Sequence, residues 1–333
     1  MLTEFLVEYG MFLAKTLTLV ALLLLSAAGL VFLIMRSRSG IDEHLDIKNL
    51  NRKYEHMQLI LNSAILPKKA FKKAVKELKA QHKKESEKPD AQSDRRRIFI
   101  LDFKGDIRAS EVASLREEIT ALLTVADKSD EVLVRLESGG GTVHGYGLAA
   151  SQLKRIRDRN IRLTVAVDKV AASGGYMMAC VADRIIAAPF AIIGSIGVIA
   201  QIPNFNRLLK KHDIDFEQIS AGKYKRTLTL FGKNTEADRE KLQQDLEETH
   251  TLFKQFVKEN RAVVDVDKIA TGEHWYGSQA LELKLVDELL TSDDYLANAV
   301  DGADLYELDY VRKKHLLEKI FSSTAKLFTP DEY

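Results

Sequence analysis

Hydrophobic and polar positions follow three successive patterns along the 333 residues of the chain. From Thr16 to Met35 twenty residues run without a charge, which is about the length that crosses a bilayer as a helix. The run is longer than the apolar core of a cleaved signal peptide, which is the alternative, and no clear small-x-small cleavage site follows it. We therefore expect residues 1–40 to form a retained transmembrane anchor.

Residues 41–97 make up the second region. Their periodicity predicts an amphipathic helical stalk over residues 42–80, interrupted at Pro67, and then a solvated linker over residues 79–97. Twelve basic against five acidic residues give the stretch 68–97 a charge of +7. No aromatic residue interleaves these charges after Phe71, so we expect a solvated or lipid-facing segment and no nucleic acid partner.

After Arg97 short apolar runs alternate with helical periodicity, which predicts an α/β domain with mainly parallel strands and right-handed crossovers. We place this domain over residues 98–300 and expect a partly helical tail over residues 301–333. The expected strands are 98–103, 131–137, 163–168, 184–188 and 214–219, and the expected helices are 110–126, 145–159, 173–181 and a long helix that begins near Thr235.

Composition and charge narrow the class of protein. With 46% hydrophobic and 29% charged residues, the chain is neither wholly disordered nor a polytopic membrane protein. Its single cysteine, Cys180, excludes an internal disulfide and a cysteine-rich metal site.

The charges beside the apolar run predict its orientation in the membrane. Arg36 and Arg38 follow the run whereas only Lys15 precedes it, and this flank alone predicts a cytoplasmic location for the domain that follows.

Three predicted loops are rich in glycine, at residues 137–142, 171–175 and 193–198. Glycine permits positive φ and a close approach of backbone to ligand, and free N–H groups at a helix start favour an anion or oxyanion. Tight strand-to-helix turns are the alternative explanation for any one of these loops. Neither a P-loop nor a strand-linked G-x-G-x-x-G occurs, so we do not expect a nucleotide.

Ser173 is the candidate nucleophile, because it follows a predicted strand and stands at a helix start beside two glycines. A helix-capping role is the alternative for this serine. His144, beside the first glycine loop, is one candidate base. Lys223 and Lys225 are two more, since a lysine acts as a base where burial lowers its pKa. The residues alone do not choose among the three.

Four motifs in order carry a resemblance to a known family. They are Ala-Ser-Gly-Gly-Tyr at 172–176, Gly-Ser-Ile-Gly-Val at 194–198, Gly-x-Tyr-Lys at 222–225 and Trp-Tyr-Gly-Ser-Gln-Ala at 275–280. Over roughly residues 97–290 the chain resembles the signal peptide peptidase A-type serine peptidases, and among them the branch with one membrane span and a single catalytic domain.

That resemblance implies a role for each matching residue. Ser173 would be the nucleophile, and Lys225, the lysine after Gly-x-Tyr, would be the general base in preference to Lys223. The oxyanion hole would be formed by backbone N–H groups of Gly174 and of Gly140 or Gly141, and the substrate groove would be shaped by Gly194, Ser195, Ile196 and Gly197.

Two positions depart from the family pattern. The first glycine loop begins Glu137-Ser138-Gly139, where the family commonly has Asn-Ser-Pro, which leaves the oxyanion donor open. Arg226 follows Lys225 where a small or acidic residue is more usual, which changes the surroundings that must keep the base neutral.

The resemblance also implies a fold and a setting. The fold would be α/β, a ClpP/crotonase-like domain of repeated β-β-α units, assembled into a homo-oligomeric ring or dome that needs no cofactor or metal. Its substrates would be peptides or proteins at the bilayer of a bacterial inner membrane, although related enzymes include forms whose catalytic domain faces the other side. A crotonase-like acyl-thioester enzyme and a non-catalytic membrane scaffold are the alternatives.

Overall fold

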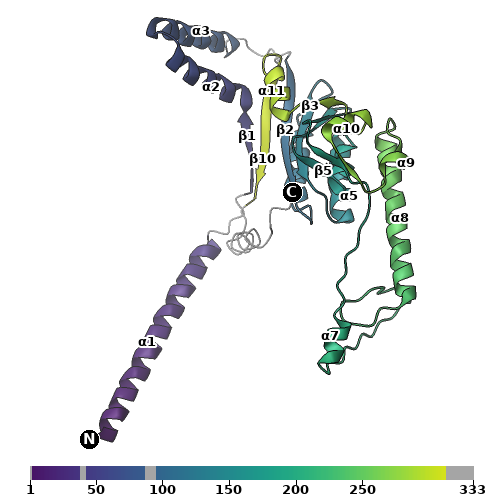
Figure 1. Cartoon of the computed structure of the whole chain (residues 1–333). Coiled ribbons are helices and arrows are strands. Elements are labelled where there is room, and N and C mark those ends of the chain that lie inside the picture. Colours follow the sequence, from purple (N-terminus) through teal and green to yellow (C-terminus); the bar gives the residue numbers. More distant parts are fainter. Residues whose placement is uncertain (1, 38–42, 87–94, 313–333) are drawn as a thin grey trace. The chain divides into compact units, whose positions relative to one another are not determined.

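A computed structural model describes residues 2–37, 43–86 and 95–312 (Figure 1). The described residues fall into two compact units, one holding the N-terminal helix and the other holding residues Leu45–Tyr310. Within the described part of the chain, helix α1 (Leu2–Ser37) is the one helix that is long and apolar enough to span a membrane, over Val7–Leu30. This window begins earlier than the predicted run, because few charges precede Thr16.

Ten strands of the described residues form one sheet. They are β1 (His44–Asn49), β2 (Arg96–Gly105), β3 (Glu131–Ser138), β4 (Arg162–Val167), β5 (Val170–Ala172), β6 (Arg184–Ala187), β7 (Ile192–Gly194), β8 (His274–Tyr276), β9 (Glu288–Leu289) and β10 (Ala303–Val311). The order is β1-β10-β2-β3-β4-β6-β9, and a branch runs from β3 through β5 and β7 to β8. Parallel pairing joins β10-β2-β3-β4-β6-β9, whereas β7 and β8 are antiparallel.

Helices cover the sheet and connect its strands. Besides α1 they are α2 (Leu50–Ile65), α3 (Lys68–Ser86), α4 (Val112–Leu122), α5 (Val143–Arg157), α6 (Gly174–Ala179), α7 (Asn206–Lys211), α8 (Glu236–Asn260), α9 (Val266–Ile269), α10 (Gly277–Glu282) and α11 (Ser292–Ala299). The expected parallel α/β class is confirmed, with β2, β3, β4 and β6 close to their predicted positions.

Strand β2 is buried on both faces, which is why its sequence is almost continuously apolar. Phe99 and Leu101 point into a large core shared with α4, α5 and α6. Ile98 and Ile100 point to the opposite face, into a smaller core that includes Leu50 of α2. Because successive side chains of a strand alternate between faces, β2 joins both cores and fixes the strands beside it.

Two segments differ from the expected helical stalk and tail. Residues 44–49 form β1, and residues 303–311 form β10, which pairs in parallel with β2. Both strands carry charged residues between their apolar ones, so their strand character depends on the neighbouring strand. Helix α3 also runs to Ser86, into the predicted linker, while residues 87–94 and 313–333 lie outside the described residues.

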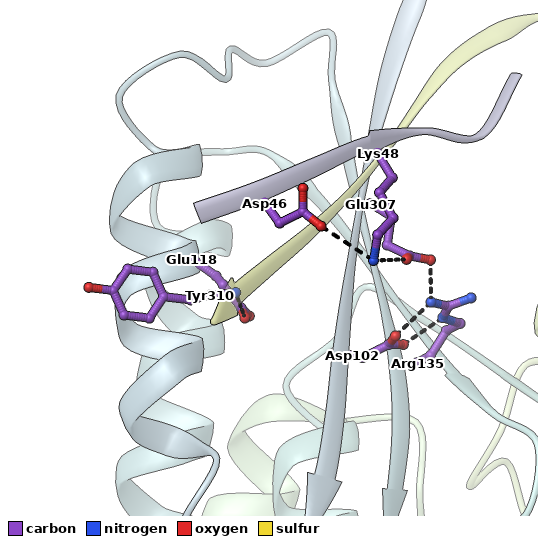
Figure 2. Close-up of polar contacts among 7 residues, drawn as sticks. All are labelled: Asp46, Lys48, Asp102, Glu118, Arg135, Glu307 and Tyr310. Atoms are coloured by element: carbon purple, nitrogen blue, oxygen red, sulfur yellow. Dashed lines mark hydrogen bonds and ion pairs between the residues drawn. The ribbon is translucent and has the colours of Figure 1, made fainter. Parts of the chain in front are cut away.

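A network of ion pairs joins β1 to the sheet interior (Figure 2). Lys48 of β1 lies 3.6 Å from Asp46 and 3.6 Å from Glu307 of β10. Glu307 accepts a 2.7 Å hydrogen bond from Arg135 of β3, which also binds both oxygens of Asp102 at 2.6 Å. The charged residues of β1 and β10 make these segments look unlike strands in the sequence. The same residues form the ion pairs that link β1, β10, β2 and β3.

The predicted strand at 214–219 does not form in the described structure. Its residues lie between α7 and α8, in a segment that Figure 1 shows at the far end of α8 from the sheet. Polar residues separate Ile214, Phe216 and Ile219, but all three are exposed and no strand lies beside them. The apolar residues of 214–219 therefore lie on the surface of this copy of the chain. We call residues 199–235 the arm.

Candidate active site

Ser173 stands between β5 and α6 in a backbone conformation that few non-glycine residues adopt. Its φ is 51° and its ψ is −117°, and its side chain makes no capping hydrogen bond. The capping explanation for Ser173 therefore lacks the hydrogen bond that defines a cap. A serine held in such a strained turn at a helix start is typical of a nucleophile presented to substrate.

The first glycine loop packs directly against this turn. A Cβ on Gly140, whose φ is +91°, would lie 2.7 Å from both the Gly174 nitrogen and the Ser173 Cβ. The Gly140 N–H donates to Ser138 Oγ at 3.0 Å. In the described part of the chain the N–H groups of Gly141 and Gly174 have no acceptor. These two amides are therefore free to receive a ligand oxygen.

The third glycine loop holds Ser173 from the other side. Gly194, with a φ of +102°, accepts a 2.7 Å hydrogen bond from the Ser173 N–H. Ser195, with a φ of 51°, donates its N–H to Glu273, and Ile196 is buried and accepts from Gly272. Residues 194–196 thus fix the Ser173 turn to the body of the domain.

The lysine segment lies in the arm. Gly222, with a φ of +98°, accepts a 3.1 Å hydrogen bond from the Lys225 N–H and closes a turn. The Lys223 amine lies over the Tyr224 ring, 5.0 Å from its centroid. Lys225 is exposed, and its amine makes no hydrogen bond, ion pair or ring contact with the residues that the structure describes. Of the two candidate lysines, Lys225 therefore has the free amine.

The structure does not bring Lys225 and Ser173 together within one copy of the chain. Every hydrogen bond of residues 204–234 stays inside the arm, as in the bond from Phe205 N–H to Leu230. Helix α8 buries only Phe253 and Val257 near its end. At 1.5 Å per residue, its start at Thr235 lies about 27 Å along the helix from that buried part.

Other candidates from the sequence are less well placed. His144 is exposed at the start of α5 and has no hydrogen-bond partner among the described residues, so no carboxylate orients it as a base. No group of three or more potential metal ligands occurs within residues 2–37, 43–86 and 95–312.

Tyr146 was not among the candidates from the sequence. It is a buried residue of α5 whose ring packs against Gly174, and no sequence motif contains it.

Comparisons with known proteins cover nearly the whole chain. Residues 4–153 match the model of the peptidase family S49 N-terminal region, and residues 155–306 match the model of peptidase family S49. The second match contains Ser173, Lys225 and the third glycine loop.

Several relatives are proteases by name. The chain is 50% identical to the probable protease SohB of Haemophilus influenzae, over 96% of this chain and 93% of that protein. It is 49% identical to the probable protease SohB of Buchnera aphidicola subsp. Acyrthosiphon pisum, over 96% and 94% of the two chains. A putative protease of Synechocystis is 32% identical over 72% of this chain and 88% of its own length.

Proposed function

Because the chain belongs to peptidase family S49, whose domain is ClpP-like, we propose that it is a serine endopeptidase with Ser173 as nucleophile and Lys225 as general base. The observation that carries this proposal is the strained Ser173 turn beside two free amides. The resemblance to signal peptide peptidase A-type enzymes, now confirmed at the level of the family, agrees with it.

The chemistry follows from these groups. Ser173 Oγ attacks the carbonyl carbon of a peptide bond while a neutral lysine amine takes the hydroxyl proton. The N–H groups of Gly174 and Gly141 donate hydrogen bonds to the developing oxyanion, and the lysine passes its proton to the leaving amine. Water then attacks the acyl-enzyme with the same lysine as base. The loop of Gly194, Ser195, Ile196 and Gly197, which is bonded to the Ser173 turn, shapes the groove for the bound peptide.

The general base comes from a second copy of the chain. Within one copy the arm carries Lys225 away from the body, and the arm exposes apolar residues such as Ile219, which is 96% exposed. Covering this surface with a neighbouring copy in a ring would bury the apolar residues and deliver the amine to Ser173. Burial at that interface would also favour the neutral form of the lysine.

Helix α1 anchors the enzyme in a bacterial inner membrane as a single span, and peptides at the membrane are the substrates. Its 24-residue apolar window, Val7–Leu30, supports the anchor. Arg36 and Arg38 after the span favour a cytoplasmic catalytic domain. Protease accessibility in spheroplasts distinguishes this side from the periplasmic one.

A fluorophosphonate probe tests the nucleophile. The proposal expects labelling of the wild type on Ser173, located by peptide mapping, and no labelling of Ser173→Ala. A wild type that is not labelled, together with peptide cleavage retained in Ser173→Ala, would favour acyl-thioester chemistry or another mechanism. A wild type that neither labels nor cleaves would favour a scaffold.

A further inference from the structure

Two buried hydroxyl groups lie directly beneath the proposed nucleophile turn, and the mechanism above does not use them. Ser138 is the last residue of β3 and is 1% exposed, and Tyr146 of α5 is fully buried. Their oxygens, Ser138 Oγ and Tyr146 Oη, are 2.6 Å apart. Both residues touch the glycines that form the candidate oxyanion hole.

The direction of each hydrogen bond can be assigned. Tyr146 Oη lies 2.7 Å from the carbonyl oxygen of Asp106, which can only accept, so the phenol hydrogen points there. Burial raises the pKa of Tyr146, so the phenol keeps this hydrogen at neutral pH. Ser138 must then donate its own hydrogen to Tyr146 Oη. This leaves Ser138 Oγ to accept from the Gly140 N–H at 3.0 Å.

These three hydrogen bonds form one directed series, which we call the chain of hydroxyls. The Gly140 N–H donates to Ser138, Ser138 donates to Tyr146, and Tyr146 donates to the carbonyl of Asp106. Because Gly140 donates inward to Ser138, its N–H is turned away from the space above Ser173. The next amide, that of Gly141, has no acceptor in the described part of the chain. The chain of hydroxyls thus decides which glycine of the loop presents a free N–H.

Three glycines keep the two hydroxyls in close contact with the backbone around Ser173. A Cβ on Gly105 would lie 2.3 Å from Tyr146 Oη and 2.5 Å from Ser138 Oγ. A Cβ on Gly174 would lie 2.3 Å from the Tyr146 ring, and one on Gly175 would lie 2.5 Å from the Ser138 carbonyl oxygen. Packing this tight transmits a small shift of either hydroxyl to the backbone around Ser173.

We propose that Ser138 and Tyr146 are positioning residues of the oxyanion hole: they hold the Gly140 N–H inward so that Gly141, with Gly174, presents the donors. This inference rests on the proposed function, since it concerns the same site. It also answers the question that the departure at residues 137–139 leaves open, because it selects Gly141 over Gly140 as the first-loop donor.

The test compares two variants of the chain of hydroxyls with a control variant at another buried tyrosine, all in the full-length enzyme. Tyr146→Phe and Ser138→Ala each break the chain of hydroxyls, whereas Tyr295→Phe removes a buried phenol that binds Glu131 in the smaller core. The readouts are the second-order rate of Ser173 labelling by a fluorophosphonate, kcat and KM for an unstructured apolar peptide, and the melting temperature.

We expect Tyr146→Phe and Ser138→Ala to lower the labelling rate and kcat by about 10- to 100-fold with KM nearly unchanged, because misplaced oxyanion donors act on the transition state. Tyr295→Phe should lower the melting temperature and leave both rates near wild type. Labelling of Tyr146→Phe and Ser138→Ala at the wild-type rate would overturn the inference, as would an equal loss of rate in Tyr295→Phe.

The two proposals fail in different ways. If wild type itself is not labelled on Ser173, the proposed function fails, whatever the variants do. If wild type is labelled and the ratio of variant to wild-type rates stays near one, only the positioning role fails. Should Tyr146→Phe not fold, Ser138→Ala, which removes a smaller group, gives the same comparison.

Discussion

The N–H of Ser173 donates a 2.7 Å hydrogen bond to the carbonyl of Gly194, and this bond joins the second glycine loop to the third. Both residues have positive φ, 51° for Ser173 and 102° for Gly194. The strain at Ser173 is therefore held by a hydrogen bond across the sheet branch that β5 and β7 form.

Substitutions in the first glycine loop should distinguish an effect on the active site from a general effect on the loop. Gly140→Ala places a Cβ 2.7 Å from the Gly174 nitrogen at a φ of +91°. We expect it to lower kcat for peptide cleavage by at least about 100-fold, because this Cβ would displace the Gly174 N–H, which is an oxyanion donor of the proposed site. Gly139→Ala is the matched control, because its Cβ meets no atom within 4 Å, and it should retain nearly full activity. An equal loss of kcat in both variants would show that any substitution in this loop disturbs the structure, and it would contradict the prediction.

The two lysines of the arm should differ in their effect on rate. Lys225→Ala should abolish peptide cleavage, because no other amine would take the Ser173 proton. Lys223→Ala should retain most of it, since Lys223 lies over the Tyr224 ring. Initial rates with an unstructured apolar peptide measure both. Full activity of Lys225→Ala with loss in Lys223→Ala would reverse the assignment of the base.

Glu118 should make stability depend on pH. Burial in α4 raises its pKa to about 7, despite a 2.9 Å hydrogen bond from the Tyr310 N–H at the end of β10, shown in Figure 2. The nearby carboxylates of Asp309, Glu111 and Asp102 raise it further. Because the folded pKa exceeds the unfolded value of 4.5, the folded state binds more protons and loses stability as pH rises from about 4.5 to 7.

The loss attributable to this one carboxyl is about 3 kcal/mol across the window. Glu118→Gln should therefore raise the melting temperature at pH 8 and reduce its difference from the value at pH 5. Glu117→Gln, which makes the same change on an exposed neighbour, is the control and should leave the pH dependence unchanged. The same pH profile in wild type and Glu118→Gln would contradict the role of burial.

Much of the core could be predicted from the sequence because its signals are local. Runs such as 98–103 and 131–137 are apolar enough to be strands on their own. The start of α8 was also readable, since Thr235 and Asp238 form a capping box. Ser173 was found because its motif combines a strand end, a serine and two glycines.

The rest depends on partners that are distant in the sequence. Strands β1 and β10 become strands by pairing at an edge, through charges such as Lys48 and Glu307 that read as helical or solvated. The apolar alternation at 214–219 signals a strand but has no neighbour within one copy. Tyr146 and Ser138 meet only because Gly105 leaves room for both, and no spacing along the chain records that.

The most direct test of the central claim, a site shared between copies, is peptide cleavage by a co-assembled mixture of Ser173→Ala and Lys225→Ala chains. Each variant alone should be inactive. A mixture assembled at random should recover about a quarter of the wild-type rate, because a Lys225→Ala chain then supplies Ser173 and its Ser173→Ala neighbour supplies the lysine. A mixture as inactive as its components, or cleavage by Ser173→Ala alone, would contradict the account.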